Sequence, residues 1–171
     1  MADTPLIRPL EPGDCDTMVS IIREGLRSLT GGSCGSGVDD RELDDLFAAY
    51  RAEDRRYLVV LEGEALLGGG GFAPLKGREG EGICELQRMY LSPDSRGRGL
   101  GRQLLERLLA EAVAAGYHRC YLETHRNMTA AQKLYTRFGF RRAEDRTGAT
   151  GHSACDLFFV KDLSPDLHLE S

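Results

Sequence analysis

The sequence predicts a single α/β (α+β) domain in which an antiparallel meander of strands leads into a parallel pair. Three observations indicate this class. The chain has 171 residues, 41% of them apolar, a size that suits one globular domain. Its 21 glycines gather in clusters, which is typical of loops and close backbone approaches. In the second half a strand, a helix and a strand follow one another, an order that favours a parallel crossover.

In the first half, the apolar pattern predicts one strand, two helices and then three strands. The first strand is expected at residues 6–8. Asp14 can cap the first helix, whose apolar residues recur every three or four positions: Met18, Ile21, Ile22, Leu26 and Leu29. A second, shorter helix is expected over residues 39–51. The three strands are expected at residues 57–62, 65–73 and 83–91, with a tight Glu-Gly-Glu turn between the first two.

In the second half, the pattern predicts two helices and two further strands. Leu100 begins a helix with a stripe of leucines on one face, and Gly116 ends it. A strand follows at residues 117–124, an amphipathic helix at 129–138 and a closing strand at 155–161. We expect the domain to span residues 1–163 and residues 164–171 to form a frayed tail.

Charge and composition exclude several classes of protein. The chain has 22 basic and 27 acidic residues, a formal net charge of −5, which is the wrong sign for a protein that binds nucleic acid through its phosphates. No apolar run approaches the ~20 residues of a membrane helix, and residues 1–9 lack the pattern of a signal peptide. We therefore expect a cytoplasmic protein with neither nucleic-acid nor membrane partners.

The cysteines and histidines predict neither disulfides nor a metal site. The five cysteines are widely spaced, and none belongs to a Cys-x-x-Cys pair, so reduced thiols are expected. The neighbouring pairs His118 with Cys120 and His152 with Cys155 offer two metal ligands each at best, and no carboxylate cluster completes them.

The most informative stretch is a glycine-rich turn between the strand at 83–91 and the leucine-striped helix. Gly97, Gly99 and Gly101 occupy alternate positions, so no side chain there keeps a ligand away from the backbone. The first N–H groups of a helix have no partner within it, and three arginines add positive charge: Arg96, Arg98 and Arg102. The combination favours a phosphate or pyrophosphate ligand. A solvated turn that only caps the helix is the alternative.

Two motifs resemble those of the GNAT acetyltransferase superfamily. Arg96-x-x-Gly99-x-Gly101, between a strand and a helix, is similar to the family's pyrophosphate motif, Arg/Gln-x-x-Gly-x-Gly/Ala. A second segment resembles the family's Asn-x-x-Ala-x-x-x-Leu-Tyr followed by Gly-Phe. Its matching residues are Asn127, Ala130, Leu134, Tyr135, Gly139 and Phe140. Both motifs keep the family's order and separation, and the resemblance runs from residue 6 to residue 163.

The resemblance implies a mixed central sheet of six to seven strands with about four helices, in which a parallel pair splays apart at the cofactor site. It also implies acetyl-CoA as the donor substrate and no metal. The pyrophosphate would lie on the amides that begin the leucine-striped helix, and the pantetheine arm beside the preceding strand. The cofactor-binding residues implied in this way are Met89, Tyr90, Leu91, Arg96, Gly97, Arg98, Gly99, Leu100, Gly101, Arg102 and Asn127. Asn127 could equally be the cap of the next helix.

Tyr135 matches the tyrosine that, in many members of the family, protonates the departing CoA thiolate. A phenol is a proton donor at neutral pH, so the resemblance implies a general acid here. Tyr135 also shares a helical face with Ala131, Leu134 and Phe138. A purely structural role in the core is therefore the alternative.

The general base is less determined. Glu85 precedes Arg96 by eleven residues, the spacing of the glutamate base in the family's histone-modifying branch, and a carboxylate facing an apolar cleft could accept a proton through a water. Alternatively, Glu85 faces outward and pairs with Arg88 or another cation. His125 and His152 are further candidates, because histidine titrates near neutral pH.

In this family the first two helices usually shape the acceptor site. Here residues 30–37 form a loop of small residues, and an acidic run follows it: Asp39, Asp40, Glu42, Asp44 and Asp45. Such a rim would attract a cationic amine, although the same charges suit a solvated helix start. The sequence thus predicts acetyl transfer to a primary amine of a small molecule or peptide. A non-catalytic acyl-CoA sensor or scaffold and a nucleotide-phosphate binder are the alternatives, and a homodimer stays open.

Overall fold

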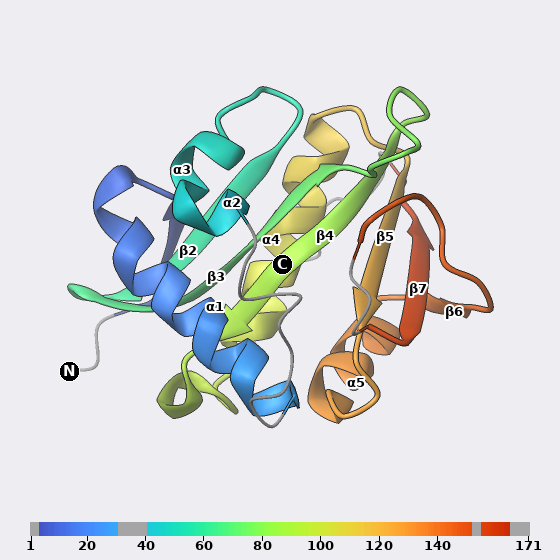
Figure 1. Cartoon of the computed structure of the whole chain (residues 1–171). Helices are drawn as coiled ribbons and strands as arrows, with labels where there is room; N and C mark the ends of the chain where they lie inside the picture. Colours follow the sequence, from blue (N-terminus) through green and yellow to red (C-terminus); the bar gives the residue numbers. More distant parts are fainter. Residues whose placement is uncertain (1–3, 31–40, 152–154, 165–171) are drawn as a thin grey trace.

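The chain folds around one seven-stranded mixed sheet (Figure 1). The computed structural model describes residues 4–30, 41–151 and 155–164. The strands lie in the order β1-β2-β3-β4-β5-β7-β6. Their bounds are β1 Leu6–Pro9, β2 Arg56–Glu62, β3 Ala65–Pro74, β4 Ile83–Leu91, β5 Arg119–Thr124, β6 Arg141–Ala143 and β7 Leu157–Asp162. Neighbouring strands are antiparallel except β4 and β5, which are parallel. The predicted mixed sheet with one parallel pair is confirmed.

The helices cover both faces of the sheet. Helices α1, α2 and α3 lie on one face and α4 on the other (Figure 1). Their bounds, with those of α5, are α1 Cys15–Thr30, α2 Arg41–Asp44, α3 Leu46–Ala49, α4 Leu100–Ala114 and α5 Thr129–Arg137. Single 3₁₀ turns precede α1 and α4, at Pro12–Asp14 and Pro93–Ser95. In the described part of the chain, no helix is long and apolar enough to cross a membrane.

The core consists of a large cluster on each face of the sheet. Alternate residues of β2 enter the two clusters: Leu58 and Val60 pack with the leucines of α4, while Tyr57 and Val59 pack with α1. A strand has this period of two because successive side chains point to opposite faces. Burial of an aliphatic side chain contributes roughly 1.5–3 kcal/mol, so the double-sided burial of β2 anchors both layers of helices.

The second predicted helix, residues 39–51, is wrong as one element. The described part of this segment forms two single turns, α2 and α3, separated by Asp45. Asp45 has φ −142° and ψ 74°, and its side chain accepts a hydrogen bond from the amide of Ala48 at 3.0 Å. An aspartate that bonds to a nearby backbone amide competes with the helix. Residues 39 and 40 lie outside the described chain.

The parallel pairing of β4 with β5 is short. Only Ile83, Cys84 and Glu85 pair with β5, opposite Arg119, Cys120 and Tyr121. Beyond Glu85 the two strands diverge towards the end of the strands where α5 lies (Figure 1). The predicted splay of the parallel pair is therefore confirmed. Over the second half of β4, no other strand of the described chain lies along the edge that faces β5.

A bulge at Arg88 changes which side chains of β4 face each cluster. Arg88 has φ 48°, and the pairing with β3 shifts register between Gly69 and Gly71. Before the bulge, Cys84 and Leu86 pack in the cluster under α4; after it, Met89 does so, while Tyr90 packs against the cluster under α1. A bulge inserts one residue and so reverses the alternation of side chains.

The glycine run in β3 makes room for aromatic rings. A Cβ at Gly71 would lie 2.7 Å from Cδ2 of Tyr57 and 2.8 Å from the carbonyl oxygen of Arg56. The close approach, and not a loop, explains these glycines. Replacement of Gly71 by alanine is expected to lower the free energy of unfolding by about 1–3 kcal/mol, because the core there has no space for another methyl group.

The matched control for this substitution is Gly13→Ala, since a Cβ at Gly13 meets no atom within 4 Å. Urea-induced unfolding followed by circular dichroism measures both variants. An equal midpoint for Gly71→Ala and the unaltered protein would contradict the packing argument.

Candidate active site

A cleft of about 510 Å³ opens where β4 and β5 diverge. Its walls come from the second half of α1, the end of β4, the glycine-rich turn with the start of α4, and α5 with the turn before it. Ten of the predicted site residues line it: Met89, Tyr90, Leu91, Arg96, Gly97, Gly99, Leu100, Gly101, Asn127 and Tyr135. Residues far apart in the sequence thus meet around one elongated hollow.

The glycine-rich turn presents backbone amides to this cleft. Gly97 and Gly99 have φ of 73° and 76°, a left-handed conformation that favours glycine. Gly99 is the N-cap of α4 and offers no side chain as a cap. The first helical hydrogen bond runs from the amide of Gln103 to the carbonyl of Gly99. The amides of Leu100, Gly101 and Arg102 precede that bond, so they are the donors that a helix leaves for an external acceptor.

The three arginines of the turn point to different places. Arg96 lines the cleft, and its Nη2 lies 3.4 Å from the carbonyl oxygen of Leu91. Arg98 instead forms an ion pair with Glu62 at 2.6 Å. Arg102 lines a neighbouring hollow between α4 and α5, together with Glu106, Lys133 and Arg137. The side chain of Arg96 therefore shares the cleft with the amides, whereas those of Arg98 and Arg102 do not line it.

Asn127 lies in the cleft wall and does not cap α5. The N-cap of α5 is Met128, so the interpretation of Asn127 as a helix cap is wrong. The backbone amide of Asn127 donates to Nδ1 of His125 at 3.1 Å. His125, half-buried in the same turn, therefore uses one ring nitrogen as an acceptor and is not part of the cleft lining.

Tyr135 is at once a core residue and a cleft residue. Its ring lies 5.8 Å from Phe140 and 6.2 Å from Phe159, centroid to centroid. It also lines the cleft, and no described residue forms a hydrogen bond with its hydroxyl group. Burial raises the pKa of Tyr135 well above that of a free phenol, so the hydroxyl keeps its proton at neutral pH.

Glu85 is buried on the face of the sheet that carries α1. Only 2% of the residue is exposed, so the alternative of an outward-facing side chain is wrong. Its Oε2 accepts a hydrogen bond from Nε2 of Gln87 at 3.3 Å, and the hydroxyl of Tyr50 donates to Oε1 of Gln87 at 2.6 Å. Glu85 sits at the last paired position of β4, just before the cleft opens.

A second buried carboxylate, Glu123 of β5, lies on this face but was not singled out from the sequence. Its side chain is 1% exposed and pairs with Arg146 at 3.3 Å. Tyr121 donates to it at 3.1 Å, and Thr150 donates to its other oxygen. These contacts hold the segment after β6 against β5. Tyr121 and Glu123 are two residues apart in a predicted strand, so the sequence could have indicated that their side chains lie on the same face.

Gly25 was also missed, although it brings α1 onto β4. A Cβ at this position would lie 2.3 Å from Cδ1 of Tyr90, and both residues line the cleft. A glycine inside a helical pattern often marks such a close approach. The packing of Tyr90 on α1 therefore requires a glycine at position 25.

Part of the predicted acceptor side lies outside the described residues: His152, the loop 31–37, Asp39 and Asp40. Of the remaining acidic run, Glu42 pairs with Arg88 at 2.9 Å, and Asp45 caps α3. Asp44 is exposed. At least two of these carboxylates therefore have partners within the protein.

The described residues contain no group of three metal-ligating side chains. The described cysteines, Cys15, Cys84, Cys120 and Cys155, are free thiols. A hydrogen bond with Cys84, together with burial, raises the pKa of Cys120, so this thiol stays protonated. Reduced cysteines are as expected for these four positions.

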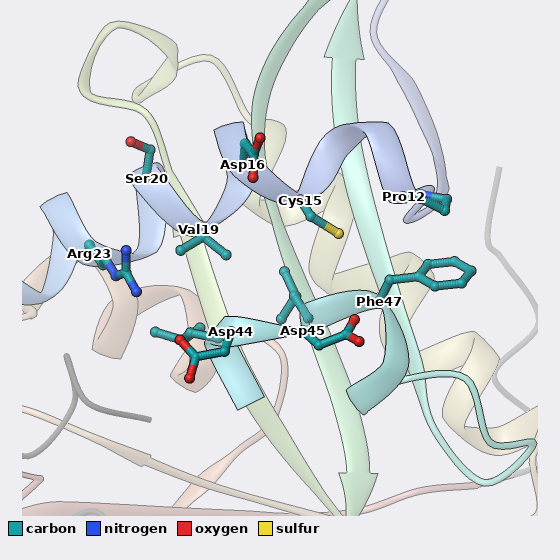
Figure 2. A pocket seen from close by; sticks show the side chains of 11 residues that line it. Pro12, Cys15, Asp16, Val19, Ser20, Arg23, Asp44, Asp45 and Phe47 are labelled. Carbon is teal, nitrogen blue, oxygen red and sulfur yellow. The ribbon is translucent and has the colours of Figure 1, made fainter. Parts of the chain in front are cut away.

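A separate hollow of about 460 Å³ lies between α1 and the turns α2 and α3 (Figure 2). Asp16 and Arg23 of α1 and Asp44 and Asp45 opposite them contribute its charges. It shares no lining residue with the cleft. Because the two hollows have different walls, this one is set apart from the glycine-rich turn and from Tyr135. Of its acidic residues, Asp45 already caps α3.

Comparison with known proteins agrees with this geometry. Residues 23–140 match the model of the acetyltransferase (GNAT) family. The chain is 38% identical over 163 residues to the uncharacterized N-acetyltransferase YjgM of Escherichia coli, with 94% of this chain and 96% of that protein covered.

Two solved structures have the same fold. An acetyltransferase of the GNAT family from Staphylococcus aureus superposes with a TM-score of 0.81 at 15% identity, covering 94% of this chain and all of the other. The acetyl-CoA complex of yncA, a putative acetyltransferase from Salmonella typhimurium, gives 0.76 at 22% identity, covering 97% and 98%. With its family match and its splayed parallel pair, the chain belongs to the GNAT acetyltransferase family and is an acyltransferase.

Proposed function

We propose that this protein transfers the acetyl group of acetyl-CoA to a primary amine of a small molecule or peptide, by direct attack of the amine on the thioester. The observation that carries the proposal is the cleft itself. Unpaired helix amides and Arg96 line one end of it, and the phenol of Tyr135 lines another part. An anion-binding end and a proton donor in one hollow suit a phosphate-bearing thioester.

The pyrophosphate of acetyl-CoA fits the amides of Leu100, Gly101 and Arg102. The helix dipole contributes ~0.3–1 kcal/mol to an anion there, and each charge-assisted hydrogen bond contributes roughly 1.5–3 kcal/mol. A Cβ at Gly97 or Gly99 would meet no protein atom within 4 Å, so space remains above the turn. The pantetheine arm would lie along Met89, Tyr90 and Leu91, where β4 has lost its neighbour and its backbone can pair with an extended ligand.

The transfer forms a bond from the amine nitrogen to the acetyl carbon and breaks the bond from that carbon to sulfur. The attacking nitrogen loses a proton, for which Glu85 is the proposed acceptor through a water. The sulfur leaves as a thiolate, and Tyr135 is the proposed proton donor. A phenol carries its proton at neutral pH, and an acid placed in this way contributes typically 10²–10⁴-fold to the rate.

Asn127 completes the proposed donor site from the opposite wall. It is freed from capping α5 and lines the cleft. Its side-chain amide can both donate and accept hydrogen bonds, which suits contact with the pantetheine arm. A non-catalytic acyl-CoA sensor would need the same donor contacts but neither Glu85 nor Tyr135.

Substitution of Tyr135 by phenylalanine is expected to lower kcat about 10²-fold, with little change in the Kd of acetyl-CoA. The ring and its contacts with Phe140 and Phe159 remain, so only the proton donor is lost. Thiol release over a panel of amines measures kcat, and calorimetry measures Kd. Unchanged turnover would show that Tyr135 has only a structural role.

Substitution of Arg96 by alanine is expected to weaken acetyl-CoA binding about tenfold, because one charged contact with the pyrophosphate is lost. Arg98→Ala is the matched control: it removes an arginine from the same turn whose side chain pairs with Glu62, while its amide remains. Calorimetry should show near-normal binding for the control. Equal losses in both variants, or binding of ATP but not acetyl-CoA, would oppose the proposed donor site.

Substitution of Glu85 by glutamine is expected to remove the low-pH limb of kcat/KM, because the base must be deprotonated to accept the amine proton. The pH profile of thiol release measures this. Because Glu85 is buried, the unfolding midpoint of the variant is measured as well, to check that it still folds. An intact limb in a folded variant would exclude Glu85 as the base and favour His125 or His152.

A further inference from the structure

We propose that Arg88 binds a carboxylate of the acceptor, so that the substrate is an amine that also carries a carboxylate, such as a free amino acid. The inference rests on the proposed acetyl transfer and specifies the class of acceptor. It is carried by the backbone of Arg88, by the contacts of its guanidinium group and by the row of hydrogen bonds that joins it to Glu85.

The backbone of Arg88 is held in a conformation that side chains rarely adopt. Within the described residues it is the only one other than glycine with a positive φ, 48°. The hydroxyl of Tyr57 donates to the carbonyl oxygen of Arg88 at 2.8 Å and so supports the bulge. Residues held in sparsely populated conformations often serve a site, where strain is retained for function. Here the bulge directs a guanidinium group to the face of the sheet that carries α1 and α2.

The guanidinium group is buried, but Glu42, a carboxylate that pairs with it, is exposed. The side chain of Arg88 is 9% exposed, whereas that of Glu42, its partner at 2.9 Å, is 52% exposed. Nη1 of Arg88 also donates to the hydroxyl of Tyr50 at 3.1 Å. An ion pair with a solvated partner contributes little, so the contact of Arg88 with Glu42 costs little to exchange. A carboxylate on a ligand can replace Glu42 and use the planar fork of the arginine.

A row of hydrogen bonds connects this guanidinium group with Glu85. Tyr50 accepts from Arg88 and donates to Gln87, and Gln87 donates to Glu85. Burial raises the pKa of Tyr50 to about 12, so Tyr50 keeps its proton and the direction of the row is set. One face of β4 therefore offers a cation at Arg88 and an anion at Glu85.

Those two charges match the two charges of an amino acid. The carboxylate of the acceptor would bind Arg88, and its amino group would approach Glu85 for deprotonation. Met89, the residue after Arg88, lines the cleft. An acceptor held in this way would therefore lie next to the part of β4 along which acetyl-CoA is proposed to bind. The competing explanation is that Arg88 and Glu42 only fasten α2 to the sheet.

The test compares amino acids with their α-amides as acceptors, by thiol release from acetyl-CoA. Each amide keeps the amine and side chain and loses only the carboxylate. We expect at least one amino acid to exceed its amide about tenfold in kcat/KM, and Arg88→Gln to abolish that ratio. Glu42→Gln removes the competing carboxylate and should lower the KM of the amino acid about threefold. Asp44→Asn, the matched control, removes a charge from the same helical turn and should leave the KM unchanged.

The ratio of amino acid to amide separates the explanations. If Arg88 only fastens α2 to the sheet, Arg88→Gln would change kcat/KM by the same factor for the amino acid and for its amide. The ratio of the two would then stay as in the unaltered protein. If that variant does not fold, the KM shift in Glu42→Gln relative to Asp44→Asn decides, because Glu42 is half-exposed. Efficient acetylation of the amides would overturn the inference and leave the transferase intact. If no amine is acetylated, the proposed function fails. Calorimetry of the amino acids with CoA present then tests Arg88 alone, and absence of binding overturns its role.

Discussion

The site depends on the short pairing between β4 and β5. The two strands share three residue pairs and then separate, so the second half of β4 keeps β3 on one edge and loses its neighbour on the other. Helix α5 and the start of α4 border the opening. A continued ladder would satisfy the backbone of β4 and close the cleft. The separation therefore creates both the space and the backbone groups that the proposed binding of a thioester requires.

The groups proposed for the two halves of the reaction come from different elements of the fold. Unpaired amides at the start of α4 form the end of the cleft that is proposed to bind phosphate, while Glu85, Gln87 and Arg88 lie on the face that carries α1 and α2. Buried polar groups are costly unless they are paired. The chain from Arg88 through Tyr50 and Gln87 meets that requirement and so gives the carboxylate of Glu85 a defined orientation.

For Tyr135 the structural and the catalytic interpretations are compatible. Its ring packs against Phe140 and Phe159, and its side chain still reaches the cleft. The burial that makes it a core residue also raises its pKa. Packing thus holds the ring in position at the cleft, and a phenol in that position carries the proton that a donor needs.

The resemblance of two motifs to the GNAT family implied most of the cleft lining. The sequence alone determined the order of the elements apart from β6, the parallel crossover and the glycine-rich turn. These features depend on local rules: apolar period, glycine conformation and unpaired amides at a helix start. Tertiary structure decided the directions of Arg96, Arg98 and Arg102, the burial of Glu85 and Glu123, and the break at Asp45. The bulge at Arg88 is a further feature of this kind, since one inserted residue turns the side chains that follow it, Met89 and Tyr90, to the other face. Which charges meet across the sheet thus follows from register, and register is a property of the assembled sheet.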